Sequence, residues 1–289
     1  MVTVLVTTDG VQVAYERRGR GPHVYVCNGG PANDFRYLAD DLRPVEDDFE
    51  LVFHDYRGSG QSGHAPQYTY TFSRLSADLD ELRSELGDEE ITVLAHSMGG
   101  FVALTYALRY PERCARIVLV GTFPTAVPRK MLPPTLRALG WGRATKMAAR
   151  AAWWVAGRSW RPPTEDRKRR LYAVWSTLQE GLAPVHARVV ERELQLGLPL
   201  ANDNIRALQR EFTSLDLIDR LREVACPVLV LCGDRDAAAV WAAGVYRAHL
   251  PDVDVVMLPD IGHEPFFEAP AASADALRSF LGGSGGITR

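Results

Sequence analysis

Short apolar stretches alternate along most of the chain with longer segments whose apolar residues recur at helical spacing. Residues 72–86 are the clearest helical case, because their leucines recur at intervals of three and four residues. Further helices are predicted over 101–108 and 271–281. The apolar stretches predict eight strands, at residues 2–7, 11–17, 23–27, 49–54, 91–95, 116–120, 226–232 and 253–258.

This order of elements predicts an α/β fold. Strands that alternate with helices form a mostly parallel, doubly wound sheet. The first two strands are the exception, because Asp9-Gly10 between them favours a tight hairpin turn. We therefore expect an antiparallel hairpin at one edge of the sheet.

The alternation stops between residues 124 and 212. This segment has a helical pattern, is broken by prolines and carries most of the tryptophans. We expect a helical cap, or lid, at 124–212 on a core domain formed by 1–123 and 213–289. Most of the tryptophans are expected to pack inside the cap, and at least one of four is expected to contact substrate, namely Trp153, Trp154, Trp160 or Trp175.

The predicted strand at 91–95 ends abruptly at a serine. The residues that follow it are His96-Ser97-Met98-Gly99-Gly100, and a helical pattern begins directly after them. A sharp strand-to-helix turn strains the serine backbone and lifts its hydroxyl clear of the sheet, while the helix N-terminus favours developing negative charge. Ser97 is therefore a candidate nucleophile, and an ordinary serine at a strand–helix junction is the alternative.

Two later strand ends carry the residue types that would activate such a serine. Gly233-Asp-Arg-Asp236 follows one strand, and His263 follows the next. The carboxyl ends of parallel strands share one edge of the sheet, so we expect these residues near Ser97. A histidine titrates near neutral pH and can take the serine proton, and a carboxylate can hold the imidazole in place. Asp234 and Asp236 both remain candidates for that carboxylate.

A glycine pair after an early strand is the candidate oxyanion site. Asn28-Gly-Gly-Pro31 follows the strand at 23–27. Glycine lets the backbone approach a substrate without a side chain in the way. We expect the N–H groups of Gly30 and Met98 to bind the oxyanion, and Gly29 to line the substrate site.

The composition of the chain argues against a nucleic-acid-binding, membrane or secreted protein. The 289 residues carry a net charge of −3, which shows no bias toward nucleic acid or an anionic membrane surface. No apolar run approaches the length of a membrane span, and the first residues lack the basic and apolar parts of a signal peptide. The four cysteines lack metal-ligand spacing. A cytoplasmic protein with reduced, buried thiols is expected.

Other polar motifs are expected to be structural. Asp55-Tyr-Arg-Gly-Ser-Gly60 reads as a turn held by its glycines, with a contact between its aspartate and its arginine. His54, His64 and His96 are expected to be structural or solvated rather than catalytic.

These motifs together resemble the α/β-hydrolase superfamily. The likeness covers nearly the whole chain outside the cap and includes Ala95-His-Ser-Met-Gly99 and the residues from Gly262 to Pro270. It implies the α/β-hydrolase fold and the chain order Ser, Asp, His of a catalytic triad. In many members the acid stands three residues after a glycine, and that pattern points to Asp236 after Gly233.

Two motifs are most similar to the proline iminopeptidase group. They are Asn28-Gly-Gly-Pro31 and Asp55-Tyr-Arg-Gly-Ser-Gly-Gln-Ser62. That group usually has His-Gly-Gly-Pro-Gly at the first site and Gly-Gly-Ser-Trp-Gly at the elbow, and this chain departs from both patterns.

The expected function is hydrolysis of an ester or amide bond of a small to medium organic substrate or a short peptide, through an acyl-enzyme. An iminopeptidase is one specific option. Carbon–carbon bond hydrolysis, lactonase activity and a receptor-like binding protein are the alternatives. No metal or organic cofactor, nucleic-acid partner or membrane partner is expected, and the sequence carries no indication of the oligomeric state.

Overall fold

The computed structural model describes residues 2–30, 34–127, 129–131, 207–208 and 210–282. Most of the expected cap lies outside these residues, and so do Trp153, Trp154, Trp160 and Trp175. The cap boundaries and the role of its tryptophans therefore stay predictions.

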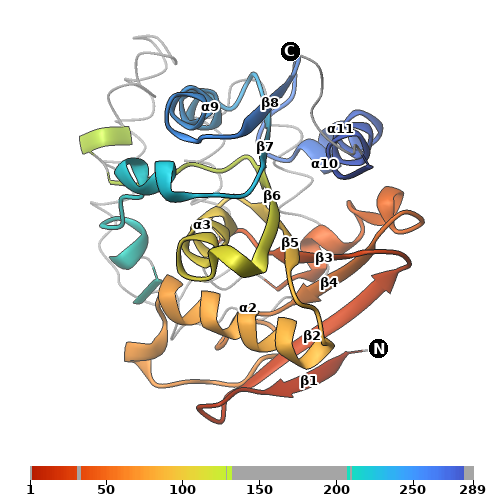
Figure 1. Ribbon diagram of the computed structural model, residues 1–289, viewed down its shortest axis with the longest axis vertical. Coiled ribbons are helices and arrows are strands. Elements are labelled where there is room, and N and C mark those ends of the chain that lie inside the picture. The colour runs from red at the N-terminus through yellow and green to blue at the C-terminus, as the bar shows by residue number, and fades with distance from the viewer. Residues whose placement is uncertain (1, 31–33, 128, 132–206, 209, 283–289) are drawn as a thin grey trace, which may run out of the picture.

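An eight-stranded sheet forms the centre of the molecule (Figure 1), in the order β1-β2-β4-β3-β5-β6-β7-β8. β1 pairs antiparallel with β2, and β2 pairs antiparallel with β4. Every later pairing in the sheet is parallel. The strands are β1 (Thr3–Val6), β2 (Gln12–Gly19), β3 (His23–Cys27), β4 (Glu50–His54), β5 (Ile91–His96), β6 (Cys114–Val120), β7 (Val228–Gly233) and β8 (Val253–Leu258). The predicted mostly parallel sheet and its antiparallel edge hairpin are confirmed.

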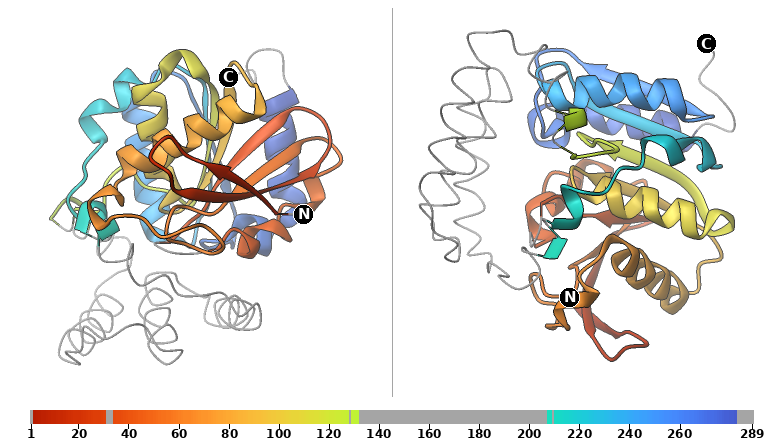
Figure 2. Two further views of the ribbon diagram at one scale, coloured as in Figure 1. Left: turned by 90° about the horizontal axis from the view of Figure 1, so that it is seen from below. Right: turned by 90° about the vertical axis from the view of Figure 1, so that its left-hand side faces the viewer.

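Helices cover both faces of the sheet (Figures 1 and 2), and their apolar side chains divide into two buried clusters. One cluster packs α2 (Phe72–Leu86), α3 (Gly99–Arg109) and α9 (Ala237–His249) against one face. The other packs α1 (Arg36–Ala39), α10 (Pro265–Glu268) and α11 (Pro270–Gly282) against the opposite face. Short 3₁₀ turns lie at η1 (Arg43–Val45), η2 (Gln67–Thr69), η3 (Pro111–Arg113) and η4 (Ile218–Glu223).

Local signals explain why α2 has the predicted ends. The Thr71 hydroxyl accepts a hydrogen bond from the Arg74 N–H at 3.1 Å, which satisfies one of the free donors of the first turn. Gly87 ends the helix with a φ of 77°, a conformation that glycine adopts without a Cβ penalty. The sequence analysis did not predict α9. Its first turn is alanine-rich and apolar on all sides, so no amphipathic pattern distinguishes it.

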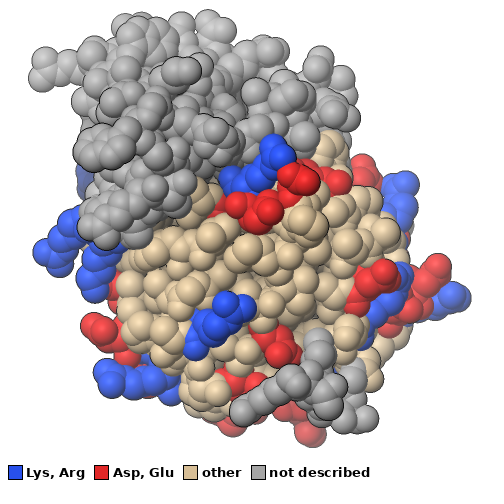
Figure 3. All heavy atoms as spheres, turned by 90° about the horizontal axis from the view of Figure 1, so that it is seen from above, with Lys and Arg blue, Asp and Glu red and all other residues tan. Residues whose placement is uncertain are grey.

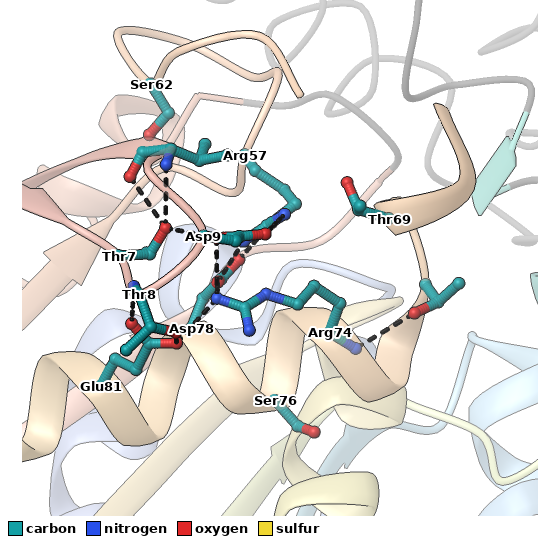
Figure 4. Close-up of polar contacts among 12 residues, drawn as sticks. Thr7, Thr8, Asp9, Arg57, Ser62, Thr69, Arg74, Ser76, Asp78 and Glu81 are labelled. Carbon is teal, nitrogen blue, oxygen red and sulfur yellow. Dashed lines mark hydrogen bonds and ion pairs between the residues drawn. The ribbon is translucent and has the colours of Figure 1, made fainter. Parts of the chain in front are cut away.

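Arg57 lies at the centre of an ionic cluster between the first hairpin and α2 (Figure 4), in which Arg57 and Asp78 are buried and the other members are partly exposed. Its guanidinium bonds both carboxylate oxygens of Asp78, each at 2.6 Å, and both oxygens of Asp9, at 2.9 and 3.1 Å. Arg74 contacts the same two carboxylates at 2.9 and 3.1 Å. We call these four residues the Arg57 cluster. Because its members come from three separate segments, the cluster ties the hairpin turn and the loop after β4 to α2.

The predicted contact between Asp55 and Arg57 does not form. The Asp55 carboxylate accepts hydrogen bonds from the backbone N–H groups of Phe35, at 2.9 Å, and Gln61, at 2.8 Å. It therefore holds the start of α1 against the loop after β4. Burial, together with the nearby charge of Asp34, raises the pKa of Asp55 to about 7.

The surface charge, the cysteines and the helix lengths bear on three expectations from the sequence. Among the described residues on the face drawn in Figure 3, acidic and basic side chains are interspersed. Cys27, Cys114, Cys226 and Cys232 are buried free thiols, as expected. Among the described helices, none is long and apolar enough to cross a membrane.

Candidate active site

Ser97 lies at the turn between β5 and α3, and its backbone is strained. Its φ is 51°, in the left-handed region that non-glycine residues seldom adopt. Its N–H donates to the Val120 carbonyl at 2.9 Å, which joins the turn to the end of β6. A Cβ on Gly99 would lie 2.4 Å from the Cys27 carbonyl oxygen, so this position of the elbow requires glycine.

His263 lies in the loop between β8 and α10 and contacts both expected partners. Its Nε2 is 2.9 Å from Ser97 Oγ, and its Nδ1 is 2.6 Å from Asp236 Oδ2. A Cβ on Gly121 would lie 2.9 Å from the His263 carbonyl oxygen and 3.2 Å from Nδ1. The strand end of β6 therefore leaves room for the imidazole only because it carries glycine there.

Asp236, rather than Asp234, is the aspartate that reaches His263. While Oδ2 contacts the imidazole, Oδ1 accepts hydrogen bonds from the N–H groups of Ala238 and Ala239, both at 3.1 Å. Asp236 is thus also the N-cap of α9, and the helix N-terminus stabilises its negative charge. Asp234 is exposed. Both carboxylate oxygens of Asp236 are thereby held in place, which fixes the direction of its contact with His263.

Burial and nearby carboxylates act in opposite directions on the pKa of His263. Burial lowers the pKa of the imidazole, but the charge and hydrogen bond of Asp236 act in the opposite direction. The charges of Glu264 and Glu268 also favour the protonated form. The net result is a pKa of about 9, well above the ordinary value for histidine. Protonation of His263 is therefore favourable in this site.

The glycine pair after β3 borders the same site. A Cβ on Gly29 would lie 3.0 Å from Ser97 Cβ, so the loop passes directly beside the candidate nucleophile. The Gly29 N–H is already used, because it donates to Tyr37 Oη at 2.6 Å. Gly30 has a φ of 61°, and Met98 is the N-cap of α3. Among the described residues, neither the Gly30 nor the Met98 N–H donates a hydrogen bond to the protein.

Tyr37 and His96 both lie beside the candidate active site, and the sequence did not predict that they contact it. Tyr37 Oη lies 2.7 Å from His96 Nδ1, and His96 Nε2 lies 3.1 Å from the His263 carbonyl oxygen. His96 is a buried structural residue, as expected, but it lies within the site rather than away from it. Tyr37 is separated from His96 by 59 positions in the sequence, and no local pattern announces such a contact.

Several other residues that the sequence singled out lie in the buried core or outside the described residues. His54 is fully buried, and burial lowers its pKa to about 4. The described part of the chain contains no group of three or more His, Cys, Asp or Glu side chains able to hold a metal ion. The tryptophans expected to contact substrate, Trp153, Trp154 and Trp175, are outside the described residues.

Comparisons with known proteins agree with this architecture. The AB hydrolase superfamily protein YclE of Bacillus subtilis is 25% identical over 288 residues, which cover 95% of this chain and 96% of that protein. The proline iminopeptidase PfmaB of Pestalotiopsis fici is 31% identical over 129 residues, 42% of this chain and 44% of that protein. This chain thus aligns with less than half of the length of PfmaB.

A solved structure and a family model extend the comparison to most of the chain. The structure of a proline iminopeptidase-related protein from Thermus thermophilus superposes with a TM-score of 0.74 at 26% identity, covering 98% of this chain and 97% of that one. A family model described as the alpha/beta hydrolase fold matches residues 22–270. The match includes six of the eight strands, β3 to β8, and the loops that carry Ser97, Asp236 and His263. The chain therefore belongs to the alpha/beta-hydrolase family.

Proposed function

We propose that this α/β hydrolase is a serine hydrolase that cleaves an ester or amide bond of a small or medium-sized organic substrate through an acyl-enzyme. The observation that carries the proposal is the unbroken contact from Ser97 Oγ through His263 to Asp236, at 2.9 and 2.6 Å. These are hydrogen-bonding distances for a nucleophile, a base and the group that orients the base.

In the first half of the reaction, Ser97 Oγ attacks the substrate carbonyl while its proton passes to His263 Nε2. The Asp236 carboxylate holds the proton on Nδ1 and stabilises the imidazolium that forms. The N–H groups of Gly30 and Met98 are proposed to donate to the oxyanion of the tetrahedral intermediate, which develops beside the N-terminus of α3. Collapse of this intermediate transfers the proton from Nε2 to the leaving alcohol or amine.

In the second half, His263 removes a proton from water, which attacks the acyl group on Ser97. The resulting intermediate collapses to release the acid, and the proton returns to Ser97 Oγ. We propose that the segment 124–212 acts as a lid over this site and determines the substrate. A closed lid would exclude water from the first step and supply apolar contacts through residues such as Trp153, Trp154 and Trp175.

An N-terminal aminoacyl amide is the specific amide substrate to test first. Asn28-Gly-Gly-Pro31 resembles the glycine motif of proline iminopeptidases without its leading histidine, and the loop beginning at Asp55 resembles their D-x-R-G-x-G-x-S motif. The partial match to PfmaB and the similarity to the Thermus thermophilus protein favour the same option.

Covalent labelling tests the proposal directly. A fluorophosphonate probe should label the wild-type chain and fail to label Ser97→Ala. A parallel panel of p-nitrophenyl esters and aminoacyl-naphthylamides, with the prolyl compound included, then distinguishes esterase from iminopeptidase activity. If the folded wild type neither reacts with the probe nor turns over any member of the panel, the serine hydrolase proposal is wrong and a binding role is favoured.

A further inference from the structure

A chain of hydrogen bonds runs behind the candidate active site from the glycine loop to the loop that carries His263. The Gly29 N–H donates to Tyr37 Oη at 2.6 Å, and Tyr37 Oη lies 2.7 Å from His96 Nδ1. On the other side of the ring, His96 Nε2 lies 3.1 Å from the His263 carbonyl oxygen and 3.3 Å from Glu264 Oε2. We call Tyr37 and His96 the relay.

The two ends of the chain determine where its protons lie. A backbone N–H can only donate, so Tyr37 Oη accepts from Gly29 and its own proton is available to His96 Nδ1. A backbone carbonyl can only accept, so the His96 proton lies on Nε2 and points to His263 O. His96 is thus the neutral Nε2–H tautomer, in agreement with burial and the His263 charge, which lower the pKa of His96 to about 3. All the donors of the chain therefore point in one direction, toward the loop of His263.

The packing around the relay leaves little freedom. A Cβ added to Gly29 would lie 2.7 Å from Tyr37 Oη and 2.8 Å from His96 Nδ1, closer than real Cβ contacts come. Both relay side chains are buried, and the rings of His96 and His263 lie 5.0 Å apart between centroids. A hydrogen bond in such a buried setting is costly to leave unmade, so each member restrains the position of the next.

We propose that Tyr37 and His96 are positioning residues. They set the distance between the glycine loop after β3, which carries the proposed oxyanion donor Gly30, and the loop that carries His263. The inference rests on the proposed function. His96 immediately precedes Ser97, so the relay connects three loops that follow three different strands, β3, β5 and β8. The Gly29 N–H, anchored on Tyr37, orients the peptide that leads to the Gly30 N–H. The relay thereby aligns one oxyanion donor with the backbone that carries the base.

Tyr37→Phe tests this role, because it removes only the hydroxyl. We expect kcat on a p-nitrophenyl ester to fall by about ten- to a hundredfold, the range in which small misplacements of catalytic groups act, while KM changes less than about twofold. The affinity for a trifluoromethyl ketone, whose adduct with Ser97 places an oxyanion in the same position, should fall by a similar factor. Tyr106→Phe is the matched control. Tyr106 is a buried residue near the C-terminal end of α3, and its hydroxyl donates to Asp80 of α2 at 3.3 Å. This variant should keep wild-type kcat and inhibitor affinity.

A double-mutant cycle adds a second readout. If Tyr37 and His96 act as one relay, the Tyr37→Phe/His96→Phe variant should be about as slow as the slower single variant, because either substitution already breaks the chain. If the two losses multiply, the residues act separately and the relay is refuted. Should His96→Phe not fold, the paired kcat and trifluoromethyl ketone measurements on Tyr37→Phe decide the question alone.

The outcomes separate the two proposals. A wild type that is inactive toward ester and probe overturns the proposed function, and the relay with it. An active wild type whose Tyr37→Phe variant matches Tyr106→Phe overturns the relay alone. A Tyr37→Phe variant that raises KM and lowers thermal stability, with inhibitor affinity unchanged, also overturns it, because those are the effects of loosened packing.

Discussion

The Arg57 cluster and the group formed by Ser97, His263 and Asp236 are both networks of polar side chains built around buried charged groups, and they differ in what their protons can do. Burial lowers the pKa of Arg57, but its hydrogen bonds to Asp78 and Asp9 raise it above the ordinary value, so the guanidinium stays charged. His263 has a pKa of about 9, which is close enough to neutral pH for the imidazole to gain and lose a proton. One network holds fixed charges and the other holds a group that can transfer a proton.

Backbone conformation separates the two networks as well. Ser97 has a φ of 51°, whereas no member of the Arg57 cluster is among the non-glycine residues with positive φ in the described chain. Strain of this kind costs of order 1–3 kcal/mol and persists only where the surroundings enforce it. Buried charge alone therefore does not mark a catalytic site. A titratable base beside a strained nucleophile is the more specific sign.

The largest expected effect is on turnover at Ser97. Ser97→Ala removes the proposed nucleophile, so kcat should fall by roughly 10⁴-fold or more. The thermal midpoint should stay near that of the wild type, since only one hydroxyl is lost. Near-normal turnover on the best substrate would show that another residue is the nucleophile.

The choice of acid gives the next largest effect. Asp236→Asn should lower kcat by about 10⁴-fold, because the amide no longer holds the productive tautomer of His263. Asp234→Asn is the matched control, two positions away and exposed, and should stay within a few fold of the wild type. Matched steady-state kinetics that ranked the two variants the other way round would transfer the role to Asp234.

The Arg57 cluster should respond in stability and not in chemistry. Arg57→Leu leaves the buried Asp78 carboxylate with only Arg74, and should lower the free energy of unfolding by about 3–5 kcal/mol. The kcat per folded molecule should be unchanged. Arg20→Leu is the control, because the ion pair of Arg20 with Asp47 is exposed and is expected to contribute no more than about 1 kcal/mol. Urea unfolding followed by circular dichroism measures both, and equal losses would remove the distinction between the two networks.

The smallest effect is a pH dependence. Because the base must be neutral to accept the Ser97 proton, kcat/KM should rise about tenfold per pH unit on the acid side of a pKa of about 9. Stability should change with pH in the opposite direction to activity. Because the pKa of His263 in the folded protein lies above its ordinary value of 6.5, protonation stabilises the fold fully below about pH 6.5. This contribution is lost as the pH rises through about 9. In Asp236→Asn the limb of any residual activity should move to lower pH. A limb that stays in place would mean that Asp236 does not set the pKa.

The sequence by itself determined the features whose causes lie within a few neighbouring residues. The strand, turn and helix around Ser97 follow from apolar periodicity and small residues, and the structure has them where they were predicted. The ends of α2 follow from Thr71 and Gly87, which act on backbone groups less than one turn away. The edge hairpin follows from Asp9-Gly10. Such features are readable because the free energy that favours them is local.

Only the tertiary structure decided between residues that differ in long-range contacts. Composition alone left Asp234 and Asp236 open, and only the family pattern pointed to Asp236. Its contact with His263, 27 residues away, forms only when β7 and β8 pair. Arg57 finds Asp9 and Asp78 rather than its neighbour Asp55, because Asp55 is turned toward the start of α1. Tyr37 reaches His96 across 59 residues because α1 packs beside the end of β5 only in the folded chain. Which buried donor meets which acceptor depends on how whole elements pack, and that packing is a property of the folded chain.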